Sequence, residues 1–313
     1  GDLDILKEVI PNTDVIFHEA ALVGQGQGQY EISRYFQNSV QATANLLDYL
    51  QNYPTSVKKI ILAGSIASYG EGSYRVIPTE GEPYNIYPLP RTNCAKGFDY
   101  TVDEEATVIP IGLSESMPQR PGSIYGLTKK IQEDMVLMFG KMKGIPCVSL
   151  RYFNIVGEGQ SLKNAYTGIM ALVYAQLRED KQPIIFEDGK QIRDFVSVHD
   201  IVQANVKALQ VFEAEGAFNI GTGKGTALLE MINLMQQKMG KENITPLITG
   251  KFRKGDTRHL VADINKSQSV LGYNPQYSLN QIIDGFLLWA DKEESLLLVD
   301  QANKELEARG LLS

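Results

Sequence analysis

The chain of 313 residues has little of the chemistry that metal centres and disulfide frameworks need. It contains two cysteines, Cys94 and Cys147, and three histidines, His18, His199 and His259. Two such cysteines cannot build a disulfide framework and lack CxxC spacing, and no cluster of His, Cys and Asp has ligand spacing. The sequence therefore predicts no metal, and the scarcity of cysteine suits a reducing, cytoplasmic compartment.

Basic residues are in the minority, with 30 Lys and Arg against 37 Asp and Glu and a formal net charge of -7. General binding to nucleic acid depends on clustered Lys and Arg, so we do not expect a nucleic-acid partner. The sequence also lacks an apolar run long enough to cross a bilayer, so we expect no membrane partner. A small anionic ligand stays possible if a few arginines are placed locally.

Apolar runs alternate with segments of helical period along the chain. Strands are predicted at residues 14–21 (DVIFHEAA), 59–64, 146–157 and 218–221, and helices at 34–50, 123–140 and 226–240. We expect the last helix to be capped and to bury Leu228, Ile232, Met235 and Met239. This alternation predicts an α/β fold with a Rossmann-like, doubly wound parallel sheet.

One segment breaks the alternation. Residues 70–121 contain Pro, Gly and Tyr without a sustained period, and they are too long for an ordinary connection. We therefore expect a functional or family-specific insert here.

A glycine-rich turn between a first strand and a first helix ordinarily opens a dinucleotide-binding fold, but none precedes the strand at 14–21. We expect that the amino-terminal portion of the fold is missing, which would leave that strand with an exposed edge. The stretch 24–29 (GQGQGQ) is a poor substitute because glutamine stands where the third glycine belongs. The stretch 221–225 (GTGKG) lacks the hydroxyl residue of a P-loop after its lysine, and we interpret it as a turn.

Tyr125 and Lys129 lie four residues apart in the predicted helix at 123–140, which places both on one face. An unperturbed tyrosine has a pKa of about 10 and is a weak base at neutral pH. A nearby ammonium would lower the pKa of the phenol by stabilising its phenolate. We expect the pair to handle a proton, whereas on an ordinary surface helix the same spacing would form a solvated face.

The context of this pair resembles the extended short-chain dehydrogenase/reductase superfamily. Residues 121–123 (PGS) precede the helix, and Ser65 ends the strand at 60–64 four residues before Tyr69 and Gly70. The resemblance spans most of the chain and implies an NAD-dependent enzyme acting on a nucleotide-diphosphate sugar. It implies that Ser65, Tyr125 and Lys129 are catalytic.

The same resemblance implies a set of cofactor-binding residues. Asp2 and Leu3 would touch adenine, Ala20 and Ala21 would lie along the ribose and nicotinamide, and Tyr152 and Phe153 would pack on the nicotinamide. Asn38 would organise an active-site water and the helix around it, with a helix-surface amide as the competing interpretation. The cofactor-binding residues implied in this way are Asp2, Leu3, Ala20, Ala21, Asn38, Tyr125, Lys129, Tyr152 and Phe153.

The implied substrate-binding residues include two arginines, whose planar guanidinium groups suit a diphosphate. They are Ser65, Asn154, Arg193 (in FEDGKQIRDFV, 186–196), Arg253 and Asp256. We expect the nearby Lys254 and Arg258 to be solvated, and His199 and His259 to be structural.

The reaction class follows from the residues after Ser65. Dehydratases of this superfamily place acidic residues there, whereas Ile66 and Ala67 cannot do acid–base work. We therefore expect a 4-epimerase with a transient 4-keto sugar. Finer motifs, including residues 305–311 (ELEARGL), resemble dTDP-L-rhamnose 4-epimerase-like proteins. UDP-glucose 4-epimerisation, a reductase or dehydratase of the same fold, and a non-catalytic fragment or scaffold stay as alternatives, as does NADP in place of NAD.

The resemblance also implies two domains. An NAD-binding domain would comprise residues 1–156 and 192–214, and a smaller α+β domain of residues 157–191 and 215–313 would bind the nucleotide sugar. We expect a homodimer through the helices at 34–50 and 123–140, which would form a four-helix contact.

Overall fold

A computed structural model describes residues 3–94, 97–102, 105–164, 168–293 and 299–312. Its centre is a parallel sheet with the strand order β1-β2-β6-β11. These strands are β1 (Val15–His18), β2 (Lys59–Ser65), β6 (Cys147–Tyr152) and β11 (Gly216–Ile220). Every residue of β2 and β6 is buried, as expected for central strands of a sheet that is covered on both faces.

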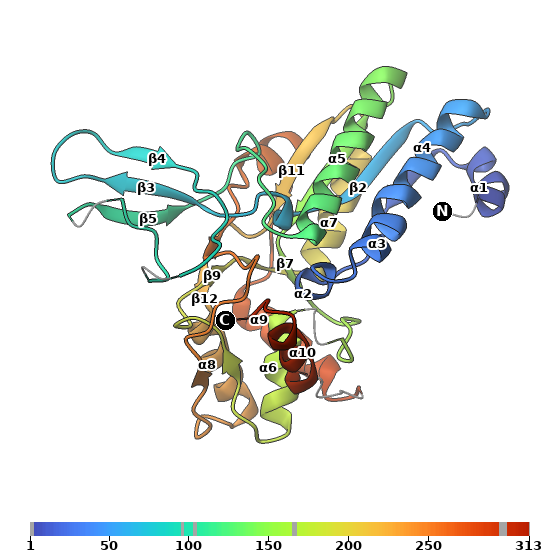
Figure 1. Ribbon diagram of the computed structural model, residues 1–313. Coiled ribbons are helices and arrows are strands. Elements are labelled where there is room, and N and C mark those ends of the chain that lie inside the picture. Colours follow the sequence, from blue (N-terminus) through green and yellow to red (C-terminus); the bar gives the residue numbers. More distant parts are fainter. Residues whose placement is uncertain (1–2, 95–96, 103–104, 165–167, 294–298, 313) are drawn as a thin grey trace.

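Helices cover both faces of this sheet (Figure 1). On one face, α4 (Ala42–Asn52) and α5 (Ile124–Lys143) share a core with Ile60 and Leu62 of β2. On the other face, α7 (Val198–Gln210) shares a core with Ile61 and Ala63. Alternate residues of one strand therefore serve opposite layers, and the predicted doubly wound α/β fold is confirmed.

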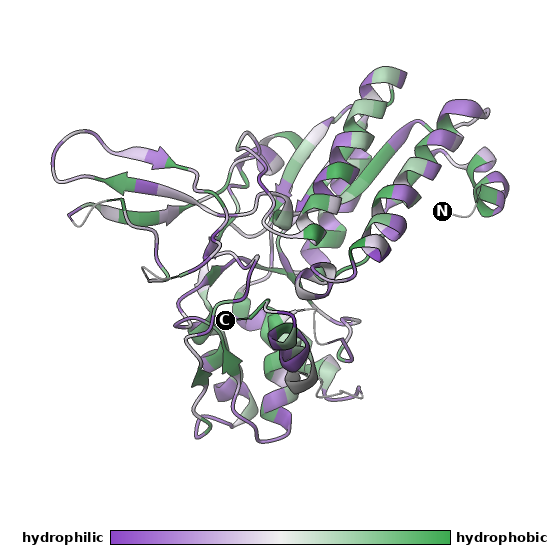
Figure 2. Ribbon diagram, viewed as in Figure 1, coloured by the Kyte–Doolittle hydropathy of each residue, from purple (hydrophilic) through white to green (hydrophobic). Residues whose placement is uncertain are grey.

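The hydropathy of the elements follows these layers (Figure 2). The ribbons of the central strands are largely hydrophobic, while the outer helices carry hydrophobic and hydrophilic residues on different sides. None of the described helices is long and apolar enough to cross a membrane.

The helix predicted at 34–50 is real but is not a uniform α-helix. It begins as α3 (Ile32–Tyr35), passes through a π-helical stretch at Phe36–Gln41 and continues as α4. Three short elements precede it: α1 (Leu3–Val9), a 3₁₀ turn (Ile10–Asn12) and α2 (Gln25–Gly28). The stretch 24–29 therefore contains a single helical turn.

The segment 70–121, which showed no period, contains an antiparallel sheet with the order β4-β3-β5. Its strands are β3 (Ser73–Ile77), β4 (Tyr84–Ile86) and β5 (Thr107–Ile111). The sheet projects away from the parallel sheet (Figure 1). It is joined closely to the rest at Gly72, where a Cβ atom would lie 2.1 Å from the carbonyl oxygen of His259.

The other large core lies among α6 (Ile169–Arg178), α8 (Leu228–Met239) and α9 (Leu279–Ala290). Short strands surround it: β7 (Asn154–Val156) with β10 (Phe195–Ser197), β8 (Ile184–Ile185) with β13 (Leu247–Ile248), and β9 (Ile192–Arg193) between β12 (Thr226–Ala227) and β14 (His259–Leu260). A 3₁₀ turn at Ile66–Ser68, a π-helical turn at Ser267–Leu271 and the helix α10 (Val299–Ala308) complete the described elements.

Two boundary predictions need correction. Thr226 belongs to β12 and does not cap α8, whose N-cap Ala227 has no capping side chain, whereas Gly240 caps its carboxyl end in the left-handed conformation as predicted. The predicted second domain included residues 216–220, but these form β11 and pair in parallel with β6. The hydrophobic sequence of β11 is buried between neighbouring layers, so it extends the central sheet. The strand at 14–21 is confirmed as β1, and it lies at the edge of the sheet as expected.

Candidate active site

Ser65 and Tyr125 meet where β2 ends and α5 begins. Ser65 is the last residue of β2, and Ser123 caps α5 by accepting a hydrogen bond from the Gly126 N–H group. A Cβ atom on Gly126 would lie 2.3 Å from the Ala67 carbonyl oxygen, so glycine allows α5 to approach this turn closely. As a result, the Tyr125 hydroxyl donates a hydrogen bond to Ser65 Oγ at 3.5 Å.

Lys129 lies one helical turn after Tyr125 and reaches the same cavity. Its Nζ donates a hydrogen bond to the Ala63 carbonyl oxygen at 2.8 Å. Burial lowers the pKa of Lys129 to about 8, with Glu19 acting in the opposite direction. The structure therefore brings the three predicted catalytic residues to one place.

The protonation of Tyr125 differs from the prediction. Burial raises the pKa of Tyr125, and the hydrogen bond with Ser65 opposes part of this increase. The expected acidification of the phenol by Lys129 is therefore not found in the protein alone. An additional positive charge beside the phenol would be needed to favour its phenolate.

A cavity of about 610 Å³ opens in front of these residues. Its lining includes the predicted Tyr152, Phe153 and Asn154 and, unpredicted, Glu19. The Tyr152 hydroxyl donates to Glu19 Oε1 at 3.2 Å and accepts from Asn205 Nδ2 at 2.8 Å. The cavity thus combines a buried cation, two hydroxyl groups and aromatic side chains at the carboxyl ends of β2 and β6, where ligands of such sheets bind.

This donor set fits the nicotinamide riboside half of NAD. Lys129 has three N–H donors, and the described contacts use one of them on Ala63. Phe153 provides an apolar wall, and Tyr125 and Ser65 stand beside it. The Oδ1 atom of Asn154 is buried without a hydrogen-bonding partner in the described residues, which indicates a group that a bound molecule would satisfy.

The other predicted cofactor residues have different outcomes. Asn38 is exposed on its helix, where its Nδ2 donates to the Arg34 carbonyl oxygen, and it does not line the cavity in front of Tyr125. Ala20 and Ala21 directly follow β1, and the Ala20 carbonyl oxygen accepts from Gln132 Nε2 at 3.5 Å. Leu3 begins α1 and is partly exposed, and Asp2 lies outside the described residues.

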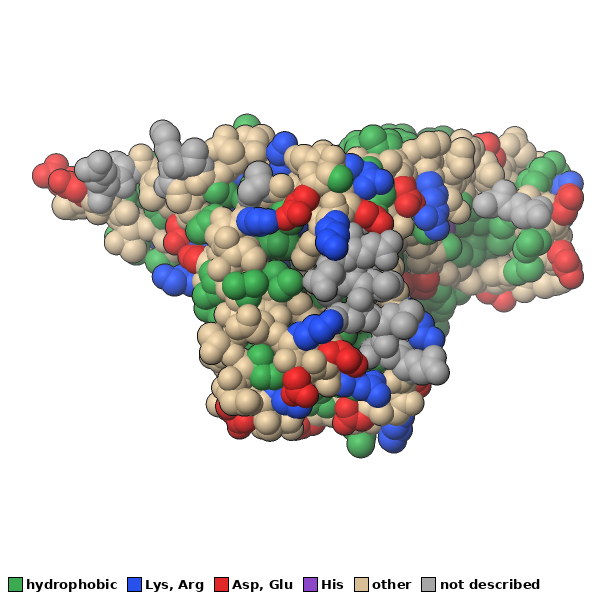
Figure 3. Space-filling model, turned by 60° about the horizontal axis from the view of Figure 1, so that its bottom comes forward, with side chains coloured by type: hydrophobic (Ala, Val, Ile, Leu, Met, Phe, Trp, Pro, Cys, Tyr) green, Lys and Arg blue, Asp and Glu red, His purple; other side chains and the backbone are tan. Residues whose placement is uncertain are grey.

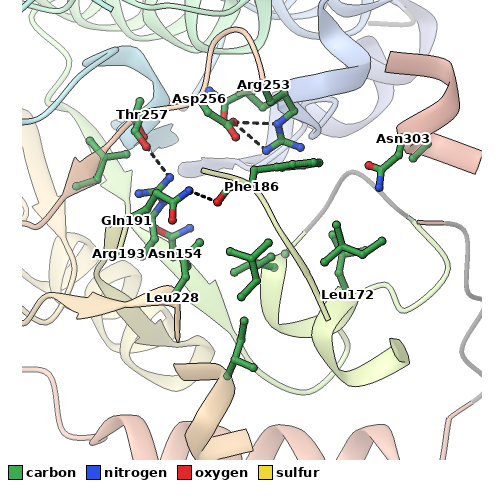
Figure 4. Close-up of a pocket in the computed structure, with 18 of the residues that line it drawn as sticks. Asn154, Leu172, Phe186, Gln191, Arg193, Leu228, Arg253, Asp256, Thr257 and Asn303 are labelled. Carbon is green, nitrogen blue, oxygen red and sulfur yellow. Dashed lines mark hydrogen bonds and ion pairs between the residues drawn. The ribbon is translucent and has the colours of Figure 1, made fainter. Parts of the chain in front are cut away.

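A neighbouring cavity of about 230 Å³ brings together the predicted substrate-binding residues Asn154, Arg193, Arg253 and Asp256 (Figure 4). The guanidinium of Arg193 donates to the carbonyl oxygens of Ile192, Thr257 and Arg258. Burial lowers the pKa of Arg193. Arg253 donates to Asp256 Oδ1 from Nε at 3.0 Å and from Nη2 at 2.8 Å. Two guanidinium groups therefore line a cavity of mixed polarity, an arrangement that suits an anionic ligand.

Arg258 was expected in solvent, but it is fully buried. It forms ion pairs with Glu187, Asp188 and Asp99, and its backbone N–H donates to Glu71. Its partners lie far apart in the sequence, so local polarity gave no signal of its burial. Acidic residues in the motif at 186–196 were the available hint that a buried cation was needed.

The remaining polar predictions agree with the structure. Lys254 is exposed. His259 is buried, and its Nδ1 accepts a hydrogen bond from the Ile192 N–H group, while His199 pairs with Glu158 at the surface. No group of three or more His, Cys, Asp or Glu in the described part of the chain could hold a metal ion.

A doubly wound parallel sheet with a Ser, Tyr and Lys cluster at its strand ends defines a protein of the short-chain dehydrogenase/reductase type. A sequence model of the NAD dependent epimerase/dehydratase family matches residues 1–95 and 101–221, and the chain belongs to that family.

Its relatives include nucleotide-sugar epimerases. The chain is 35% identical to dTDP-L-rhamnose 4-epimerase of Burkholderia thailandensis over 284 residues, which cover 90% of this chain and 76% of that protein. It is 29% identical to a putative UDP-glucose 4-epimerase of Methanocaldococcus jannaschii, in a match that covers 92% of this chain and 81% of that protein. A structure of UDP-glucuronic acid 4-epimerase from Bacillus cereus, in complex with UDP-glucuronic acid and NAD, matches with a TM-score of 0.72 and 25% sequence identity. The match covers 93% of this chain and 79% of that chain.

Proposed function

We propose that the protein is an NAD-dependent 4-epimerase of a nucleotide-diphosphate sugar, with dTDP-L-rhamnose as the first candidate substrate. The observation that carries the proposal is the 3.5 Å contact between Tyr125 and Ser65 in a cavity shared with Lys129. The higher identity to a dTDP-L-rhamnose 4-epimerase than to the UDP-glucose 4-epimerases supports this sugar nucleotide over UDP-glucose.

The protein's own groups account for the proton transfers. NAD, when bound, supplies the acceptor and donor of hydride at the sugar C4. Tyr125 takes the proton of the C4 hydroxyl and later returns it, while Ser65 hydrogen-bonds the same sugar oxygen. The 4-keto sugar turns over between these events, and Asn154, Arg193 and Arg253 retain its nucleotide diphosphate.

The walls of the cavity also support epimerisation over dehydration. Ile66 and Ala67 follow Ser65 and line both cavities, and neither side chain can exchange a proton. An elimination of the C6 hydroxyl would need an acid and a base at that position. Proton NMR of the full-length protein with dTDP-L-rhamnose, and separately with UDP-glucose, distinguishes the two epimerase candidates by which C1 signal changes.

Replacement of Tyr125 by Phe tests the proposed proton transfer. We expect kcat to fall by about 10²- to 10⁴-fold, because the general acid–base group is lost while the ring still fills its site. Tyr53→Phe, at a partly exposed tyrosine on the far end of the same helical layer, is the matched control. Turnover by Tyr125→Phe at the parent rate would disprove the mechanism.

We further propose a cytoplasmic homodimer. Ile131, Met135, Met138 and Met142 form an apolar row at helical spacing on α5. The side chains of Met138 and Met142 are 63% and 71% exposed. A second copy of this face would cover them in a two-fold contact. The division into an NAD-binding and a nucleotide-sugar-binding domain, apart from β11, remains part of this proposal.

A further inference from the structure

The two cavities share part of their walls, which orients any ligand that spans them. Both are lined by Gln25, Ile66, Ala67, Asn154 and Gly168. If the sugar reaches Tyr125, as the proposed function requires, its diphosphate lies near Asn154 and Arg193. The nucleoside then occupies the part of the smaller cavity farther from Tyr125.

The helix α10 forms one wall of the smaller cavity. Ala302 and Leu306 are buried against the cavity, and Asn303 projects toward it from α10 (Figure 4). In the same view Asn303 and Arg193 stand on opposite sides of Phe186. The Asn303 amide makes no hydrogen bond with another residue in the described parts of the chain. It is therefore available to a ligand.

Contacts on two sides hold α10 in place. The Tyr30 hydroxyl donates to Glu305 Oε2 at 3.0 Å, and the guanidinium of Arg309 stacks 4.2 Å from the Tyr30 ring centroid. Glu307 pairs with Lys251, and the Lys254 N–H donates to the Leu311 carbonyl oxygen at 3.0 Å. The segment thus connects the α2–α3 loop with the loop that carries Arg253.

We infer that Asn303 hydrogen-bonds the polar edge of the nucleotide's pyrimidine base. Uracil and thymine present a carbonyl acceptor beside an N–H donor, and one carboxamide offers the complementary donor and acceptor. The lining of the cavity combines apolar side chains such as Leu172 and Leu306 with the two arginines, so it offers an apolar surface for a base as well as cations for a diphosphate. This inference rests on the proposed function, because it requires a nucleotide diphosphate in this cavity.

Equilibrium titration of the full-length protein with dTDP, UDP and inorganic pyrophosphate tests the assignment. We expect Asn303→Ala to lower the affinity for dTDP and UDP by roughly tenfold, because its hydrogen bonds are lost, and to leave the affinity for pyrophosphate unchanged. Asn303→Asp keeps the shape but removes the donor, so it should weaken both nucleotides as well. Lys304→Ala, on the exposed side of α10, should match the parent.

The outcomes separate this inference from the proposed function. Parent-like nucleotide affinity in both Asn303 variants would overturn the contact with the base, and so would an equal loss of pyrophosphate affinity. Failure of the parent protein to bind dTDP or UDP would overturn the proposed function together with the inference. Normal turnover of a sugar nucleotide by the parent, with unchanged binding in the variants, would overturn the inference alone.

Discussion

Burial controls the charge of several residues beside the candidate site. It lowers the pKa of Lys129 to about 8 and raises that of Glu19. Burial, followed by the charge of Lys129, lowers the pKa of His18 to about 4. His18 Nε2 lies 2.7 Å from Thr43 Oγ1, so a neutral ring is retained between β1 and α4. His18 and Lys129 therefore bind protons more weakly in the folded protein than in the unfolded chain.

This difference predicts a loss of stability in acid. The unfolded chain protonates His18 near its ordinary pKa of about 6.5, whereas the folded chain does so near 4. Lowering the pH from 7 to 5 should thus reduce the free energy of unfolding by about 2 kcal/mol through His18. Urea denaturation at both pH values measures the loss. The His18→Gln variant should lose correspondingly less free energy of unfolding between pH 7 and pH 5, since His259 is present in both proteins and contributes equally. Identical losses in the two proteins would contradict the prediction.

Among the elements, the insert at residues 70–121 is tied by buried charges to the smaller cavity, which Arg193 lines. Arg91 and Arg258 both pair with Glu187, and Glu71 accepts the N–H group of Arg258. The carbonyl oxygen of Arg258 in turn accepts from Arg193. The insert therefore helps to fix an arginine of the cavity, which gives a structural role to a segment without sequence period.

Removal of the central cation should break this connection. Arg258→Met leaves the buried Glu187 and the partly buried Asp188 with less compensation, and we expect a destabilisation of about 3–5 kcal/mol. Urea denaturation at pH 7 provides the measurement. Arg75→Met, at an exposed arginine of β3, should change the free energy of unfolding by less than about 0.5 kcal/mol. A similar small change in Arg258→Met would refute the role of the buried network.

At the scale of the whole molecule, charge and exposed apolar residues bear on its partners. Basic and acidic side chains are interspersed on the face shown in Figure 3, and no extended basic patch gathers among the described residues there. The net charge of -7 agrees with this distribution. The apolar row on α5 is the feature that favours association with a second copy.

A charge placed in that row should separate the proposed dimer. Met138→Asp would put a carboxylate against its two-fold mate, and sedimentation velocity should then show a monomer. Val202→Asp, on the exposed side of α7 across the sheet, should leave the mass unchanged. A parent protein that is monomeric, or a dimeric Met138→Asp, would exclude this interface.

Local sequence, together with the family resemblance, was sufficient for the fold class and for the cluster of Ser65, Tyr125 and Lys129. Alternating buried strands and helical periods need only neighbouring residues to be recognised, and Tyr125 and Lys129 share a face because four residues make about one helical turn. Ser65 ends the apolar run at residues 60–64, and the resemblance to the superfamily singled it out. Each of these features depends on a pattern within a few residues.

Tertiary structure decided the rest, because it depends on contacts between distant segments. The π-helical stretch at Phe36–Gln41 adds a residue to the turn, and Asn38 is exposed while Ser39 is buried. Arg258 is buried by Asp99 and Glu187, and Asn303 reaches the cavity because α10 is held by Tyr30 and Lys251. The sequence alone determined which residues could do the chemistry, and long-range packing determined which of them face the site.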